Sequence, residues 1–483
     1  MAFVSLVLFG ASGAGAQPTG EDGAIDGAPS AVDPYFPSLG NSGYDVDHYD
    51  VELWIDPGRR FVRGTTSINL VPKVALRSFT FDLVGFEVTG VEVDGVPARF
   101  AREDRKLRVT PEQPLAEGSS VEVRVGYEGK PQRPQPYTGW IWFRGGGALL
   151  SPQPSGARTL FPCNDHPSDK ATFAYDLTTP RGTTAVANGL PSELPAPDAD
   201  SERVAWSEPG SLPTYAAVVA VGRYRLTEEI GEDGLPAINA FPERYAGRLA
   251  ERLRRQDEIV SVLEDRLGPY PYSSIGAIVT PVGGVDAMEA ASRPTYNGIR
   301  WALEGRYFEQ VVAHEIAHQW LGNTVSFGSW RDIWLTEGFS TYGELLWISH
   351  KRGVPIGKLF KRNSDVFGYY RSMNEVPPGN PGPRRIFNVS VYNRGALTLE
   401  ALRRTVGDEV FYEILREWVD RYRDNNATTE DFILLSELIS GRDLDEFFDR
   451  WLYKKRLPSL PGAPQEQNES RDVSEIQLTE IPR

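Results

Sequence analysis

The order of apolar and polar residues divides the chain into two parts. From Gly43 to about Leu226, apolar and polar residues alternate over short stretches bounded by Gly, Pro and Asp, as in Tyr49–Ile55 and Val121–Tyr127. Such alternation predicts antiparallel strands with one face in contact with water. We therefore expect an N-terminal antiparallel β domain over residues 41–228.

Beyond Leu226 the apolar residues recur at helical spacing instead. Residues 243–267 form an amphipathic helical pattern, and a strand-like stretch follows at Ile275–Thr280. Further helices are expected at residues 303–321, 333–350, 393–422, 429–439 and 443–454. The predicted fold is a multidomain one, β and then α+β, in which a mainly helical domain over residues 229–458 follows the β domain. A cleft between the two domains is the expected place for a functional site.

The two ends of the chain differ from the rest. Residues 1–16 join an apolar stretch to the small residues Ala14-Gly15-Ala16, a pattern typical of a secretory signal peptide. We expect a secreted or periplasmic protein, or a cytoplasmic one if this segment is not a signal. Residues 17–40 predict a flexible linker, because their first part is rich in Gly, Ala, Pro and Asp. Residues 459–483 contain few large apolar residues and predict a disordered tail.

Composition excludes several classes of function. The chain has 51 Lys and Arg against 66 Asp and Glu, a net charge of −15, so we expect no nucleic-acid partner. One cysteine, Cys163, allows neither an intramolecular disulfide nor a cysteine-rich zinc site. The apolar N-terminal run is too short to span a bilayer, so no integral membrane segment is expected in the mature chain.

Two of the five histidines lie four residues apart in the sequence His314-Glu-Ile-Ala-His318, within an apolar pattern that predicts a buried helix. Residues at i and i+4 share a helix face, so both imidazoles can bind one Zn²⁺ ion. Glu315 is placed to reach a water on that ion and to act as general base. Glu337, on the next predicted helix, follows His318 after 18 intervening residues. We predict one zinc ion per chain, held by His314, His318 and Glu337.

This motif, followed by the sequence WLTEGFSTY at residues 334–342, resembles the metal signature of the M1 zinc aminopeptidases, a gluzincin family. Three further segments resemble motifs of that family. Asp286–Ala290 is similar to its exopeptidase motif, Val391–Ala396 to the segment with its catalytic tyrosine, and Gln153–Asp165 to a loop that reaches the active site. The resemblance extends from about Gly43 to Leu457, and the short region after Tyr392 is similar to the family's short bacterial branch, which lacks a large C-terminal helical domain.

The resemblance implies a thermolysin-like catalytic domain that removes N-terminal residues from peptides. Tyr392 would stabilise the oxyanion, and Glu289 would bind the free amine of the substrate. Further candidate substrate contacts are Gly283, Gly284, Ala287, Met288 and Gln153. Asp286 and Ala290 replace the Gly and Asn of the family motif, so the preferred N-terminal residue stays open. The physiological substrate and the oligomeric state stay open as well.

Other functions fit part of this pattern. An endopeptidase or an epoxide hydrolase could use the same zinc site, although an endopeptidase has no use for an amine anchor such as Glu289. An inactive peptide-binding scaffold would typically lack Glu315 or a metal ligand, and this chain has all four residues. Asp332 and Glu344 are candidates for orienting the zinc ligands. Structural or surface roles are expected for the remaining histidines and the cysteine, which are His48, His166, His350 and Cys163.

Overall fold

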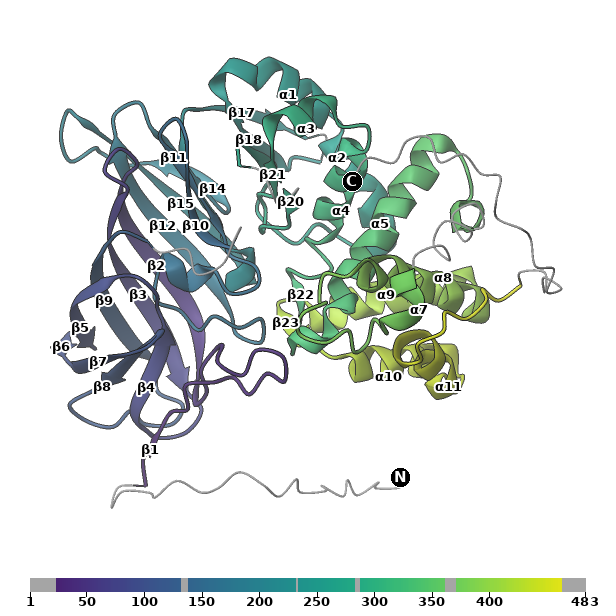
Figure 1. The fold of residues 1–483 in the computed structure, drawn as a ribbon, viewed down its shortest axis with the longest axis horizontal. Coiled ribbons are helices and arrows are strands. Elements are labelled where there is room, and N and C mark those ends of the chain that lie inside the picture. Colours follow the sequence, from purple (N-terminus) through teal and green to yellow (C-terminus); the bar gives the residue numbers. More distant parts are fainter. Residues whose placement is uncertain (1–22, 132–137, 232, 283–286, 361–370, 463–483) are drawn as a thin grey trace.

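The computed structural model describes residues 23–131, 138–231, 233–282, 287–360 and 371–462. The predicted signal peptide, residues 463–483 of the predicted tail, and Gly283 and Gly284 lie outside these residues. In Figure 1, the strands of the first half of the chain lie beside a mainly helical second half. The predicted order of a β domain followed by a helical domain is confirmed.

The N-terminal domain is built around an eight-stranded sheet of order β14-β15-β12-β2-β3-β9-β5-β6. Buried and more exposed residues alternate along its central strands, which is the burial that the alternating sequence predicts. The strands span β2 Tyr44–Asp56, β3 Phe61–Pro72, β5 Glu87–Val93, β6 Val96–Pro97, β9 Val121–Gly129, β12 Lys170–Pro180, β14 Leu190–Glu193 and β15 Ser201–Pro213.

Two four-stranded sheets complete this domain. Their orders are β1-β4-β8-β7 and β10-β11-β16-β13. Paired strands of the domain are antiparallel, as predicted, except that β2 pairs with β12 and β1 with β4 in parallel. Alternation cannot reveal such a pair, since it depends on the long connection between the strands. The bounds are β1 Ile25–Asp26, β4 Leu76–Asp82, β7 Arg99–Glu103, β8 Lys106–Thr110, β10 Gly139–Phe143, β11 Gly147–Ser151, β13 Thr184–Ala187 and β16 Val219–Gly222.

The prediction of a flexible linker over residues 17–40 is wrong for residues 23–40. Here β1 pairs with β4, and the buried Asp33 carboxylate accepts hydrogen bonds from Ser329 Oγ (3.0 Å) and the Trp330 amide (2.8 Å) of the helical domain. The same carboxylate lies 3.3 Å from His166 Nε2 of the β domain. Backbone pairing and one buried carboxylate hold this segment in place, although its composition offers few apolar residues.

The helical domain begins with a mixed five-stranded sheet of order β17-β18-β19-β21-β20. Its strands span β17 Tyr224–Ile230, β18 Pro236–Pro242, β19 Ile275–Thr280, β20 Ala287–Met288 and β21 Thr295–Asn297. The predicted strand at Ile275–Thr280 is confirmed. The predicted domain boundary at residue 228 falls inside β17, which pairs with β18 and so belongs to this sheet.

Three predicted long helices are each replaced by two shorter ones. Residues 243–267 form α1 and α2, residues 303–321 overlap α3 and α4, and residues 393–422 form α8 and α9. Gly407, at φ +92°, separates α8 from α9 in a conformation that an α-helix does not use. The helices span α1 Ala246–Leu253, α2 Gln256–Leu267, α3 Ile299–Glu304, α4 Phe308–Ala317, α5 Trp334–Arg352, α7 Arg371–Glu375, α8 Gly395–Val406, α9 Asp408–Tyr422, α10 Thr429–Ser440 and α11 Asp445–Phe448.

Short elements connect these helices and the two domains. A two-stranded sheet pairs β22 (Val325–Phe327) with β23 (Asn425–Ala427). Short 3₁₀ segments are η1 Ala157–Thr159, η2 Thr214–Ala216, η3 Glu243–Tyr245 and η4 Trp330–Asp332, and π-helical segments are η5 Ser390–Arg394 and η6 Asp449–Tyr453. Buried apolar side chains form one continuous cluster through both domains. Within the ranges that the structure describes, no helix combines the length and apolar character needed to cross a membrane.

Candidate active site

Both predicted histidine ligands lie at the C-terminal end of α4. This helix buries Phe308, Val312 and Ile316, as its apolar spacing predicts. His314 lies within the helix and His318 directly follows its last residue, with the His318 amide still donating to the His314 carbonyl at 3.2 Å. The four-residue spacing therefore places both imidazoles on one buried face.

Glu337 completes the set from the first turn of α5. Its Oε2 atom lies 3.3 Å from Nε2 of His314 and 3.3 Å from Nε2 of His318, and the two Nε2 atoms are 3.1 Å apart. Ligand atoms at about 2.0–2.1 Å from a tetrahedral zinc ion are roughly 3.3 Å from one another. The three donor atoms thus form a triangle of the size that one Zn²⁺ ion requires, and these residues fit the predicted metal.

The other ring nitrogens fix how the imidazoles are turned. His318 Nδ1 lies 3.1 Å from the Leu321 carbonyl, which only accepts, so this nitrogen carries the proton and Nε2 is free to bind a metal. His314 Nδ1 faces Glu344 Oε2 at 3.9 Å. Asp332 instead accepts a hydrogen bond from Thr429 Oγ1 at 2.7 Å. Of the two predicted orienting carboxylates, Glu344 faces the predicted ligand His314, whereas Asp332 is hydrogen-bonded to Thr429.

Tyr392 lies beside the donor triangle on the π-helical segment η5. Its ring stacks against His314, with centroids 6.0 Å apart and planes 24° from parallel. A π-helical turn adds a residue to the helix path and so changes the direction in which its side chains point, which is common at functional sites. The segment ends at Arg394, and α8 begins at Gly395.

A pair of glycines lets η5 and α8 approach α5. A Cβ atom at Gly338 would lie 2.8 Å from the Gly395 Cα, and one at Gly395 would lie 2.7 Å from the Gly338 Cα. Real Cβ atoms do not come so close to backbone atoms, so both positions require glycine at this separation. The contact brings Glu337, next to Gly338, toward Tyr392.

Glu289 follows strand β20 and is buried at the same site. Gln153 Nε2, from the N-terminal domain, donates to Glu289 Oε1 at 2.5 Å. The Glu289 carbonyl accepts hydrogen bonds from Asn323 Nδ2 (2.5 Å) and from Gln319 Nε2 (3.4 Å). Sequence reasoning missed Gln319 and Asn323. Their position soon after His318 indicated that they lie near the site. Their partner, the Glu289 carbonyl, comes from a distant segment of the sequence, so the contact itself could not be predicted.

One cavity of about 730 Å³ joins these groups. Apart from Gly283 and Gly284, which lie outside the described ranges, all the predicted metal, catalytic and substrate-binding residues line it. Ala287 and Met288 form part of its wall beside Glu289. The remaining lining residues were not predicted, and they are Phe36, Thr138, Ser151, Pro154, Pro383, Arg384, Arg385, Ile386, Phe387 and Asn388.

The carboxyl groups of the cavity differ in acidity. Burial raises the pKa of Glu315 well above its ordinary value, and burial also raises the pKa of Glu289. For Glu337 burial acts in the same direction, but hydrogen bonds from His314 and His318 outweigh it and hold the pKa below the ordinary value. Glu315 can thus accept a proton in the same pocket in which Glu337 stays charged.

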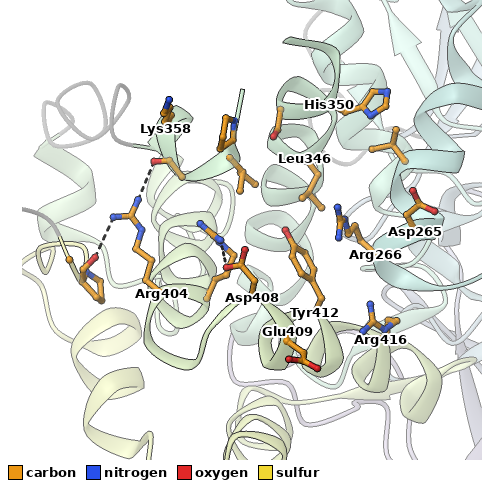
Figure 2. Close-up of a pocket in the computed structure, with 18 residues that line it drawn as sticks. Asp265, Arg266, Leu346, His350, Lys358, Arg404, Asp408, Glu409, Tyr412 and Arg416 are labelled. Carbon is orange, nitrogen blue, oxygen red and sulfur yellow. Dashed lines mark hydrogen bonds and ion pairs between the residues drawn. The ribbon is translucent and has the colours of Figure 1, made fainter. Parts of the chain in front are cut away.

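A second and larger cavity, of about 1020 Å³, lies elsewhere in the helical domain. Figure 2 shows charged side chains of α2, α8 and α9 around it, among them Arg266, Arg404 and Arg416. None of the predicted site residues lines this cavity. Its size therefore does not make it the place of the predicted chemistry.

Both domains match models of known protein families. Residues 45–216 match the peptidase M1 N-terminal domain, and residues 252–451 match the peptidase family M1 domain.

Solved structures and curated proteins agree with this assignment. An M1 zinc metallopeptidase from Deinococcus radiodurans is 30% identical, with a TM-score of 0.79, over 89% of this chain and 99% of that chain. A mutant of the Deinococcus enzyme, solved bound to a Tyr-Ser-Ala substrate, also has a TM-score of 0.79 and 30% identity over the same shares of both chains. Aminopeptidase M1 of Arabidopsis thaliana is 26% identical over 332 residues, which are 64% of this chain and 37% of that protein.

The chain spans less than half the length of the curated relatives that it matches, such as Probable aminopeptidase 2 of Sulfurisphaera tokodaii, which is 28% identical over 62% of this chain and 40% of its own length. The likeness to the Deinococcus structure, by contrast, covers nearly all of that chain. With both domain models matched, the three predicted metal ligands brought together and the two-domain fold shared, the chain belongs to peptidase family M1.

Proposed function

We propose that this protein is a zinc aminopeptidase, which hydrolyses the N-terminal peptide bond of peptides with a free amine. The observation that carries the proposal is that the donor triangle, the buried Glu315 and the Glu289–Gln153 pair line one cavity. The Arabidopsis and Sulfurisphaera relatives, both named as aminopeptidases, and the peptide bound to the Deinococcus mutant support it.

In this proposal, the carboxylate of Glu289 binds the substrate amine. Its carboxylate is buried, accepts a hydrogen bond from Gln153, and has a pKa that burial raises, so it gains most from a cationic partner that replaces lost water. A peptide ammonium group is such a partner. Because Glu289 is held through its carbonyl by Asn323, the position of this anchor relative to α4 is fixed. The anchor sets which peptide bond lies at the metal ligands.

Hydrolysis needs a proton acceptor and a donor to the oxyanion. When bound by His314, His318 and Glu337, zinc would polarise the scissile carbonyl and acidify a water molecule. Glu315 accepts the proton of the attacking water and passes it to the leaving amine, for which its raised pKa suits it.

Tyr392 donates its hydroxyl hydrogen to the developing oxyanion. Burial, together with the charges of Glu337 and Glu289, raises the pKa of this phenol well above its ordinary value. The hydroxyl is therefore protonated at neutral pH and remains a donor.

The endopeptidase alternative uses the same metal ligands but has no need of an amine anchor. Glu289 and Gln153 both line the cavity beside Glu315, which favours an enzyme that reads the N-terminus. No comparable observation favours an epoxide hydrolase or an inactive scaffold.

Hydrolysis of aminoacyl-arylamides tests the proposal. We expect turnover by the wild type, its loss by about 10²-fold or more in Glu315→Gln, and its loss after chelation with recovery on adding Zn²⁺. Glu289→Ala should raise KM for the free-amine substrate while leaving bound zinc at one equivalent. A wild-type protein that holds zinc at one equivalent but cleaves no member of the panel would contradict the proposal.

A further inference from the structure

Two arginines line the active-site cavity. Among the predicted site residues, only Tyr392 lies near them in the sequence. Arg384 and Arg385 lie in the loop that precedes η5. In the described part of the chain, no other arginine or lysine lines this cavity. The same cavity holds the carboxylates of Glu289, Glu315 and Glu337, so it contains separate anionic and cationic groups.

Both guanidinium groups are available to a ligand. Arg384 and Arg385 are exposed, and neither side chain forms a hydrogen bond or an ion pair with any residue that the structure describes. This contrasts with Arg403 and Arg404 of α8, whose guanidinium groups pair with the buried Glu400. An unpaired arginine at the wall of a cavity is free to bind a carboxylate through two parallel hydrogen bonds.

The loop that carries both arginines, residues 380–389 and called here the arginine loop, has a fixed position relative to the catalytic groups. The Ser390 amide donates to Asn388 Oδ1 at 3.0 Å and the Val391 amide donates to the Asn388 carbonyl at 2.7 Å. Ile386 is buried between the arginines and this turn. Tyr392 follows directly, so the loop and the oxyanion donor belong to one continuous hydrogen-bonded segment.

The N-terminal segment holds the other end of this loop. Tyr35 donates its hydroxyl to Asn380 Oδ1 at 2.6 Å and accepts from the Gly382 amide at 3.0 Å. Phe36, which lines the cavity, packs edge-on against Trp330 with centroids 5.7 Å apart. The arginine loop is therefore supported at both ends, which limits how far its backbone can move.

We propose that Arg384 and Arg385 bind a carboxylate of the substrate beyond the scissile bond. The preferred substrates are then short peptides that have an ammonium group at one end, bound by Glu289, and a carboxylate at the other. This inference rests on the proposed aminopeptidase function and adds a substrate class to it. Complementary charges at the two ends orient the peptide and select against peptides with a neutral or cationic distal end.

The test compares three peptides: Leu-Ala-Ala, with a C-terminal carboxylate; its C-terminal amide, with no distal carboxylate; and the amide Leu-Ala-Asp-NH₂, with a carboxylate on its third side chain. For the wild type we expect kcat/KM for the acid to exceed that for the neutral amide by about tenfold, mainly through KM. The double variant R384A/R385A should bring this ratio close to one. The variant R384K/R385K should keep part of it, because a lysine retains the charge without the paired geometry.

Arg416→Ala supplies the matched control. Arg416 is an exposed arginine that lines the remote cavity of Figure 2, and it should leave the acid-to-amide ratio at the wild-type value. If the aspartyl amide regains the rate of the acid, a side-chain carboxylate serves as well as the C-terminal one. If it does not, the ligand is the C-terminal carboxylate alone. Both results support the proposal.

A wild-type ratio near one, or an R384A/R385A variant that keeps the full wild-type ratio, overturns the assignment of the arginines. A leucyl-arylamide assay, run in parallel on the wild type, separates this failure from that of the proposed function. Turnover of the arylamide without any preference for the acid peptide removes only the carboxylate site. Absence of turnover on the arylamide and on all three peptides removes the aminopeptidase function itself.

Discussion

The hydroxyl of Tyr392 lies among acidic groups, and this determines what it can do. Its ring stacks on His314, and its phenol has a pKa that burial and the nearby Glu337 raise well above the ordinary value. A tyrosine in these surroundings keeps its proton. Its hydroxyl can then donate a hydrogen bond to a negatively charged oxygen that forms nearby. In the proposed mechanism, the residue therefore contributes more to the transition state than to substrate binding.

Tyr392→Phe tests this role because it removes the hydroxyl and retains the ring. We expect kcat to fall by about 10²–10³-fold with little change in KM, since one oxyanion donor is lost. Steady-state kinetics on one arylamide, with zinc content measured in both proteins, provides the data. An equal kcat in the variant, at equal zinc content, would show that Tyr392 has no part in the reaction.

At the scale of elements, the sequence predicted which segments carry the site better than it predicted their ends. The helical spacing of His314 and His318 places both on one face, and the structure agrees because a local i,i+4 relation depends only on the helix itself. The end of α4 at Ala317, four residues before the expected end, depends instead on the turn that leads to Gly322 at φ +134°.

The contact between α5 and α8 could not be predicted from one sequence. A glycine such as Gly338 is unfavourable inside a helix, and nothing in the sequence around it indicates that it contacts Gly395. Only the folded structure shows that the two glycines let the element with Glu337 approach the element with Tyr392. A local weakness in helix propensity thus corresponds to a requirement of the site.

Gly338→Ala tests the importance of this contact. The added Cβ would lie 2.8 Å from the Gly395 Cα, so we expect α5 and α8 to separate, with a loss of stability of about 1–3 kcal/mol and a lower kcat. Thermal unfolding and arylamide turnover measure the two effects. Gly247→Ala in α1 is the control, since its Cβ would meet nothing within 4 Å, and it should leave activity unchanged. Normal stability and activity in Gly338→Ala would refute the role of the pair.

At the scale of the whole molecule, the site depends on both domains. Gln153 comes from the N-terminal domain and its hydrogen-bond partner Glu289 from the helical domain. Tyr215 of the N-terminal domain donates its hydroxyl to the Gly322 carbonyl, just beyond His318, at 2.5 Å. The candidate site therefore lies where the β domain meets the helical domain, which is where the sequence analysis expected a cleft.

The part of the whole-molecule arrangement that the sequence did not predict is the N-terminal segment. Residues 23–40 have the composition of a linker, yet Asp33 connects His166 with Ser329 and Trp330, and Phe36 reaches the cavity. Composition reports how much apolar area a segment can bury, and it cannot report that a single carboxylate satisfies donors from two domains. The shape of the cavity could not be predicted from the sequence for the same reason.

The most direct test of the proposed aminopeptidase function is to identify the first product released from one unlabelled peptide and from the same peptide with an N-acetyl group. Mass spectrometry of the early reaction should show the free N-terminal amino acid from the first peptide and little or no cleavage of the second, because the acetyl group removes the charge that Glu289 is proposed to bind. Cleavage of both peptides at an internal bond, at equal rates, would contradict the assignment of an aminopeptidase.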